Sequence, residues 1–304
     1  MFEIKASDLK KINGITCLEF CYGLILLYLD IPTYYLYYKS FYSVHFILSD
    51  LIKKGQSFIS YDDVGRMHEI GDKLNILKLE YCERTVDEIE HMYNSLSIEI
   101  PIVVKIYSNS LSIYDSVEVP LGNHFVLLTQ LTHVKVKFID TFLEQEVVIT
   151  REQFETCYSG KVFFMKMLYR PTEEQMNLNN LLKKFISDLD DQQVSFDYSS
   201  FLQECDELKN ENQALNLRDA IGISRILLRR ALDFFANQQT IHDPIIYRSL
   251  IPKLEVKLTL LNQVFLKIDY YRVKQNWRFK NLTDQLNQIM SLDIEIYKDL
   301  KGLI

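Results

Sequence analysis

The residues of this chain that are best suited to chemistry are a cysteine near the N-terminus and, far downstream, a histidine and an aspartate in neighbouring segments. Cys17 begins an apolar run, His124 opens the apolar segment that follows Gly122, and Asp140 comes sixteen residues after the histidine. In nucleophilic catalysis an imidazole takes the thiol proton and a carboxylate fixes the imidazole tautomer. The order thiol, imidazole, carboxylate therefore predicts an enzyme that passes an acyl group through a thioester on Cys17.

The sequence around Cys17 predicts a helix that starts at the nucleophile and covers residues 17–29. Thr16 is the expected N-cap, and the positive end of the helix dipole favours the thiolate form. Cys21, one turn further on, is expected to be a small core residue. The backbone N–H of Cys17 and the side-chain amide of Asn13 are the candidate oxyanion donors. A buried structural role for Cys17 and a turn-forming role for Asn13 remain the alternatives.

His124 follows a long loop, residues 108–122, of the kind that often forms one wall of a site. Asp140 ends the next predicted strand, where its carboxylate can accept the imidazole N–H. The alternative for Asp140 is a turn-forming residue after a strand. His133 is the competing base, but it falls in a polar turn and is expected to face solvent.

Length, net charge and cysteine content limit the number of domains and the class of protein. A chain of 304 residues exceeds what one core usually supports, so two domains are expected. The net charge of −7 argues against unspecific nucleic-acid binding, and the apolar run at 17–29 is too short to anchor the chain in a membrane. The cysteines are odd in number and scattered, which predicts reduced thiols, a cytoplasmic protein and no metal site. They are Cys17, Cys21, Cys82, Cys157 and Cys205.

The character of the chain changes near Arg170–Pro171, which predicts an α+β domain over residues 1–170 and an all-α helical domain over 171–304. The first domain is expected to have helices over 17–29, 37–53, 85–95 and 151–158 and strands over 57–60, 76–79, 101–107, 124–130, 134–139, 146–149 and 162–167. Capping boxes at Thr85 and Thr150 begin two of the helices. The second domain shows helical spacing over 172–190, 199–213, 217–236, 243–273 and 281–300, with the charges of 253–257 expected on a solvated face.

Residues 122–165 resemble the bacterial peptidases that remove bacteriocin leaders, a papain-like family. The shared features are the Gly-Asn-His-Phe-Val sequence around His124, the aspartate at a strand end, and a pair of cysteines, Cys17 and Cys21, with three residues between them. The family has a glutamine six residues before its nucleophile, where this chain has Lys11. The resemblance implies a papain-like fold with Cys17 as nucleophile. The absence of the glutamine favours acyl transfer over peptide hydrolysis.

The layout of the whole chain is similar to the butirosin biosynthesis acyltransferase family, in which a papain-like domain precedes a helical domain. The strand at 101–104, the tyrosine-containing loop after it and the Gly-x-His motif carry this similarity. It implies transfer of an acyl group from the phosphopantetheine thiol of an acyl or peptidyl carrier protein to a small-molecule amine, with no other cofactor, in specialised-metabolite biosynthesis.

Three interpretations follow. The leading one is this acyltransferase or condensing enzyme, with Cys17, His124 and Asp140 as nucleophile, base and orienting residue. The second is a papain-like cysteine peptidase or amidase, and the third is a catalytically silent papain-like binding domain. The sequence leaves the oligomeric state open, a homo-oligomer included. Basic residues of the helical domain are candidates for docking an acidic carrier, against the alternative of ordinary surface charge: Arg225, Arg229, Arg230, Arg272 and Lys274.

Overall fold

The computed structural model divides the chain into two compact units, which are described separately below. The first unit comprises residues 1–36 and 62–176, and the second comprises residues 37–61 and 177–304. Within them the structure describes residues 4–12, 16–37, 40–54, 77–95, 101–115, 123–167, 172, 178–187, 189, 197–207, 211–236, 244–274 and 282–302. The predicted strand at 57–60 lies outside the described residues.

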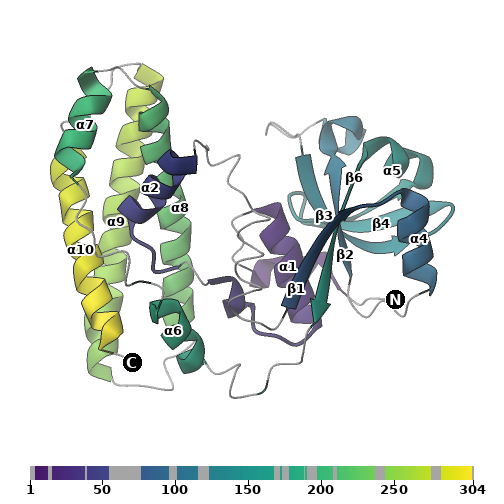
Figure 1. Ribbon diagram of the computed structural model, residues 1–304, viewed down its shortest axis with the longest axis horizontal. Coiled ribbons are helices and arrows are strands. Elements are labelled where there is room, and N and C mark those ends of the chain that lie inside the picture. Colours follow the sequence, from purple (N-terminus) through teal and green to yellow (C-terminus); the bar gives the residue numbers. More distant parts are fainter. Residues whose placement is uncertain are drawn as a thin grey trace. The chain divides into compact units, whose positions relative to one another are not determined.

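The first unit contains one six-stranded antiparallel sheet in the order β1-β6-β2-β3-β4-β5 (Figure 1). The strands are β1 (Leu77–Glu83), β2 (Ile102–Tyr107), β3 (Asn123–Leu131), β4 (Lys135–Asp140), β5 (Gln145–Thr150) and β6 (Tyr158–Met167). Tight connections make β3, β4 and β5 a consecutive meander, as the alternating apolar pattern predicted. An α+β class is thus confirmed for this unit.

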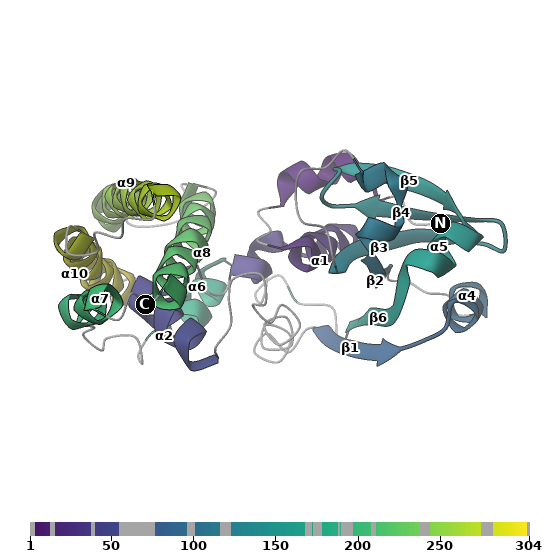
Figure 2. The same cartoon turned by 90° about the horizontal axis from the view of Figure 1, so that it is seen from above.

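Helices lie against the sheet on both faces (Figure 2). They are α1 (Cys17–Tyr28), α4 (Val86–Ser95) and α5 (Arg151–Cys157). One face carries a fully buried apolar cluster to which Ile89 of α4 and Phe154 of α5 contribute. Helix α1 packs against β3 instead. A methyl group at Gly23 would come within 2.5 Å of Ile12, so the glycine allows the segment before α1 to pack closely on the helix.

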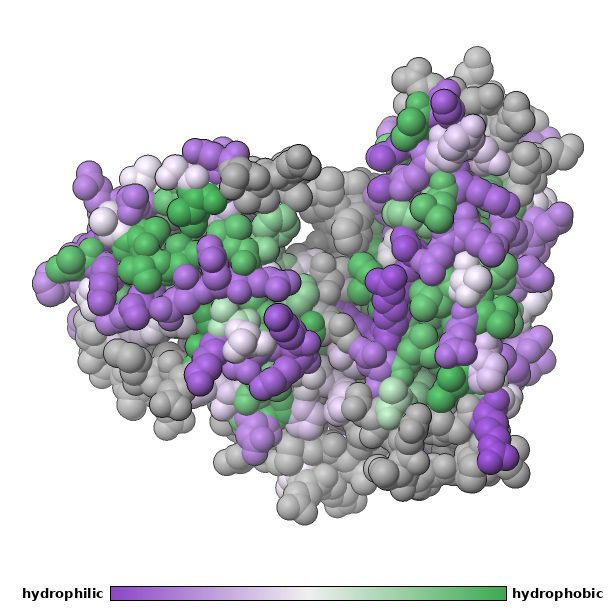
Figure 3. Space-filling view, turned by 180° about the vertical axis from the view of Figure 1, so that it is seen from behind, coloured by the Kyte–Doolittle hydropathy of each residue, from purple (hydrophilic) through white to green (hydrophobic). Residues whose placement is uncertain are grey.

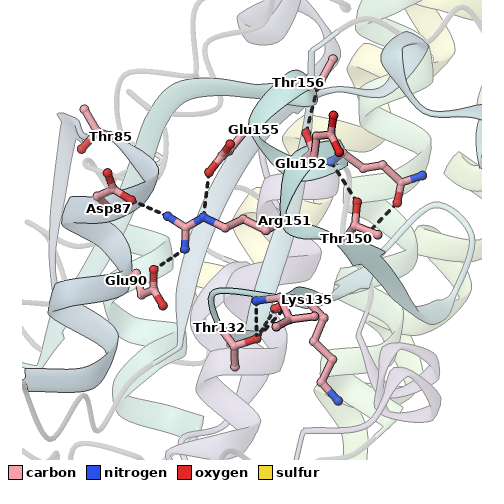
Figure 4. Close-up of polar contacts among 12 residues, drawn as sticks. Thr85, Asp87, Glu90, Thr132, Lys135, Thr150, Arg151, Glu152, Glu155 and Thr156 are labelled. Atoms are coloured by element: carbon pink, nitrogen blue, oxygen red, sulfur yellow. Dashed lines mark hydrogen bonds and ion pairs between the residues drawn. The ribbon is translucent and has the colours of Figure 1, made fainter.

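Arg151 joins the two helices that cover the apolar cluster (Figure 4). It starts α5, and its guanidinium forms ion pairs with Asp87 and Glu90 of α4. Its Nε also donates to Glu155 one turn along its own helix, at 2.7 Å. Both helices begin with the predicted capping boxes, of Thr85 with Glu88 and of Thr150 with Gln153.

The second unit is helical. Its described helices are α2 (Val44–Lys54), α6 (Leu178–Ser187), α7 (Tyr198–Glu207), α8 (Glu211–Ala236), α9 (Pro244–Lys274) and α10 (Thr283–Lys301). Helix α9 packs against α8 and α10, and α2 packs against α8. Helix α9 continues through Pro252. The solvated face predicted over 253–257 is wrong at Lys257, which is buried and whose charge is compensated by an ion pair with Asp293 of α10.

The predicted boundary near residue 170 misplaces one segment. Residues 37–61 belong to the helical unit, although they precede the sheet in sequence. The physical reason is the apolar face that this segment presents to α8. The ring of Phe41 lies 6.4 Å from that of Phe234 and 5.7 Å from that of Phe235, and the Arg230 guanidinium stacks on Tyr37 at 5.7 Å.

None of the described helices is long and apolar enough to cross a membrane. The outer surface of the helical unit nevertheless mixes apolar with polar side chains (Figure 3). Helix α9 exposes an apolar stripe at helical spacing, consisting of Val256, Leu266, Tyr270 and Val273.

Candidate active site

Cys17 lies in the first turn of α1, as predicted. The Thr16 hydroxyl accepts a hydrogen bond from the Glu19 N–H at 3.4 Å, which caps the helix one residue before the thiol. Cys17 is partly exposed, whereas Cys21, one turn later, is fully buried. Of these two thiols, that of Cys17 is therefore the one open to solvent.

His124 connects the thiol to Asp140. Its Nε2 lies 3.1 Å from Asp140 Oδ2, and because a carboxylate can only accept, Nε2 carries the proton of this hydrogen bond. The Cys17 side chain also acts on this ring and helps to raise the pKa of His124, and with Nε2 bonded to Asp140 the ring nitrogen left for the sulfur is Nδ1. The strand register explains the pairing: Val126 lies directly opposite Asp140, and His124 points to the same sheet face two residues before Val126.

Four hydrogen bonds hold the Asp140 carboxylate, which is fully buried. Oδ1 accepts the backbone N–H groups of Phe142 and Leu143 at 2.7 and 2.8 Å, and Oδ2 accepts the Tyr114 hydroxyl as well as the His124 ring. The turn-forming role considered for Asp140 and its orienting role thus involve different oxygens. With both oxygens occupied the carboxylate has a fixed orientation.

Tyr114 is the residue of this group that sequence reasoning missed. It lies on the short 3₁₀ helix η5 (Ser112–Tyr114), within the loop that was predicted to form a site wall. Its ring packs edge-on to His124 with centroids 6.0 Å apart, and Phe142 packs edge-on at 6.4 Å. A tyrosine in that loop was visible in the sequence, but no spacing rule connects it to Asp140.

These contacts set the charges of the site. Burial acts to lower the pKa of His124, but the hydrogen bonds and charges of Asp140 and Cys17 act in the other direction and raise the pKa of His124 to about 9. Burial acts to raise the pKa of Asp140, yet its bonds to His124 and Tyr114 hold the pKa of Asp140 below its ordinary value. At neutral pH the site therefore contains an imidazolium between a carboxylate and the Cys17 sulfur.

Cys21 behaves as the core residue that was predicted. Burial, then the neighbouring Cys17 and Asp140, raise the pKa of Cys21 well above its ordinary value, so its thiol stays protonated. The thiol donates to the backbone carbonyl of Phe125 at 3.7 Å, which attaches α1 to β3 beside the site.

The two candidate oxyanion donors are the side chain of Asn13 and the backbone N–H of Cys17. Asn13 lies outside the described residues. The Cys17 N–H is at the start of α1, where no earlier carbonyl of the helix can accept it. As for metals, the described part of the chain contains no group of three or more His, Cys, Asp or Glu side chains that could hold an ion.

The basic residues considered for carrier docking differ in how far their side chains are exposed. Arg230 is 1% exposed and so cannot contact a partner, which corrects that expectation. Arg225 is part-buried, donates to Asn262 at 2.6 Å and stacks on the Phe265 ring at 4.3 Å. The remaining three side chains are exposed: Arg229, Arg272 and Lys274.

Neither protein-family models nor curated proteins match the chain in sequence comparisons.

Proposed function

We propose that the protein is a papain-like cysteine acyltransferase that carries an acyl group as a thioester on Cys17. The observation that supports this proposal most is the His124 ring, whose pKa the Cys17 side chain helps to raise and whose Nε2 is hydrogen-bonded to the buried Asp140. Cys17, His124 and Asp140 supply the nucleophile, proton carrier and orienting carboxylate that acyl transfer needs.

The reaction has two halves. In the first, Cys17 Sγ bonds to the carbonyl carbon of an acyl thioester, and the donor C–S bond breaks as His124 gives its proton to the departing sulfur. In the second, an amine nitrogen bonds to the same carbon and His124 takes one amine proton. The bond from the carbon to Cys17 then breaks and the thiolate is restored. The Cys17 N–H supports the oxyanion in both halves.

A thioester donor fits the site better than a peptide does. A thiolate leaves more readily than an amine, so a thioester requires less help from oxyanion and leaving-group contacts. Lys11, which stands where the resembling peptidases have glutamine, is exposed and ion-paired with Asp8 at 2.7 Å. We therefore infer that the donor is the phosphopantetheine thioester of an acyl or peptidyl carrier protein and that the acceptor is a small amine.

The cysteines support a cytoplasmic setting for this chemistry. The four cysteines whose side chains the structure describes are free, including the two partly exposed ones, Cys17 and Cys82. A nucleophilic thiolate needs reducing conditions to stay unoxidised. We infer that the protein works in the cytoplasm.

Product analysis tests acyl transfer against hydrolysis. With an acyl N-acetylcysteamine thioester as donor and a primary amine as acceptor, we expect amide to exceed free acid, because the Cys17 thioester reacts with the better nucleophile. Cleavage of peptides without amide formation would instead favour the peptidase, and no reaction with any acyl donor would favour the silent binding domain. Chromatography with mass detection separates amide from acid.

The charge of His124 predicts the pH dependence of the first half-reaction. His124 is protonated below its pKa of about 9, so its proton is available to the leaving thiol at neutral pH and is lost above that value. We expect the acylation rate to fall about tenfold per pH unit above about pH 9. The protonated ring also contributes stability that is complete below its ordinary pKa of 6.5 and lost as pH rises through about 9, so thermal unfolding shifts to lower temperature over that interval.

Stopped-flow acylation rates, corrected for spontaneous thioester hydrolysis, measure this alkaline limb of the pH–rate profile, in which the rate falls as pH rises. The Asp140→Asn variant is the control, because losing the carboxylate removes part of what raises the pKa of His124 and moves the limb to lower pH. A wild-type limb centred on the ordinary histidine value of 6.5 would contradict the proposed ion pair.

A further inference from the structure

The sheet face that supports α1 carries a row of aromatic rings beside the nucleophile. This ring row consists of Phe125, Phe163 and Tyr81, on β3, β6 and β1. The Phe125 and Phe163 centroids lie 5.2 Å apart edge-to-face, and Phe163 and Tyr81 lie 4.7 Å apart. Phe125 is half-buried, Phe163 is buried and Tyr81 is 40% exposed, so the row ends at the surface.

Two lysines lie over the ring row. Lys105 is directly opposite Phe125 in the β2–β3 ladder, and its Nζ lies 5.9 Å from the centre of that ring. The Lys161 Nζ lies 5.6 Å from the centre of the Tyr81 ring. Both distances are those of cation–π contacts.

A bulge in β6 brings the second lysine next to the first. Val104 pairs with Val162 and Ile106 with Tyr158, so three residues of β6 oppose Lys105 alone. Gly160, in the bulge, has φ +83°, a left-handed conformation that glycine adopts without strain. Bulges of this kind occur next to active sites, where they redirect side chains.

Lys105 is close enough to Cys17 to be affected by its charge. Cys21, one turn along α1, touches the Phe125 carbonyl oxygen at 3.7 Å, and Lys105 is the cross-strand partner of Phe125. Burial, then the charge of Lys161, lower the pKa of Lys105, and the charge of Cys17 acts to raise it.

The positive charge of this pair is incompletely matched. Lys161 faces Glu83 across the β1–β6 ladder. Lys105 is half-buried, and no ion pair to it occurs among the described residues. A partly desolvated ammonium without a carboxylate partner favours the binding of an anion.

We propose that Lys105 and Lys161 bind an anionic group on the acyl substrate delivered to Cys17, while the half-buried Phe125 ring and the exposed Tyr81 ring contact the apolar part of the same substrate. This inference rests on the proposed function, since it names the substrate class of that site: acyl groups bearing a carboxylate. The N-acetylcysteamine donors used below lack the carrier's phosphate, so they test the carboxylate of the acyl group alone.

Alkylation of Cys17 tests the lysine pair without requiring acyl transfer. Iodoacetate and iodoacetamide differ in one carboxylate, and peptide mass spectrometry reports the rate of each at Cys17. We expect the ratio of the iodoacetate rate to the iodoacetamide rate to fall about three- to tenfold in Lys105→Met and in Lys161→Met. The matched control is Lys135→Met, which removes the same charge from an exposed site on β4 and keeps the wild-type ratio.

A second arm uses N-acetylcysteamine thioesters of glutarate and valerate, whose acyl chains have the same number of carbons and differ in a terminal carboxylate. The wild type should acylate Cys17 with a lower KM for the glutaryl donor, and Lys105→Met should remove that preference. An unchanged alkylation ratio in Lys105→Met, together with active acyl transfer, would overturn the lysine site alone. A lowered ratio without acylation by either thioester would retain the lysine site and overturn the proposed function.

Discussion

Acyl transfer in the Cys17→Ala variant is expected to fall by at least about 1,000-fold, to the rate of the uncatalysed reaction. The reason is that Cys17 combines the features of the nucleophile: a position in the first turn of α1, partial exposure and an interaction with His124 that helps to raise the pKa of that ring. The measurement is the amide formed per minute from an acyl N-acetylcysteamine thioester and a primary amine.

Cys21→Ala is the matched control for this result. Cys21 is on the same helix, but its thiol is fully buried and its pKa is raised well above the ordinary value. Its replacement leaves a small cavity that costs about 1 kcal/mol of stability and spares the chemistry. Loss of transfer in Cys21→Ala with transfer retained in Cys17→Ala would reverse the two roles.

Asp140→Asn is expected to lower the rate of acyl transfer by about 100- to 10,000-fold. The carboxylate fixes the proton on His124 Nε2 and raises the pKa of His124, so the amide removes both the ring orientation and the imidazolium. An amide has one acceptor oxygen where Asp140 uses two, so at least one buried donor loses its partner, at a cost of about 1–3 kcal/mol. Rates measured below the thermal transition separate the catalytic loss from the loss of stability.

Two variants calibrate that result. Tyr114→Phe removes one of the four hydrogen bonds of Asp140 and keeps the charge, so its effect should be smaller, about tenfold or less. Asp115→Asn removes an exposed carboxylate from the same loop and should leave the rate unchanged. If Asp140→Asn is no slower than Asp115→Asn, Asp140 does not orient the histidine.

The sequence predicts best those parts of the molecule that local chemistry determines. The N-cap at Thr16 and the capping boxes at Thr85 and Thr150 place three helix starts correctly, because capping involves residues three positions apart. The His124–Asp140 pairing follows from consecutive antiparallel strands, in which a short connection leaves little choice of register.

Other features depend on contacts between distant segments, and these the sequence does not predict. Phe41 and helix α2 pack with α8, nearly 200 positions later, so a boundary drawn from the change in composition misassigns their segment. The bond from Tyr114 to Asp140 links a loop to a strand end. Arg230 and Lys257 look like surface charges in sequence but are buried against Tyr37 and Asp293 respectively.

The mass of the protein after incubation with an acyl thioester, without amine, tests the thioester on Cys17 most directly. We predict a single increment equal to the acyl group, located on the peptide that contains Cys17, absent from Cys17→Ala, present in Cys21→Ala and removed when amine is added. Amide formation without any such adduct, or an adduct on another residue that amine converts to product, would contradict the account.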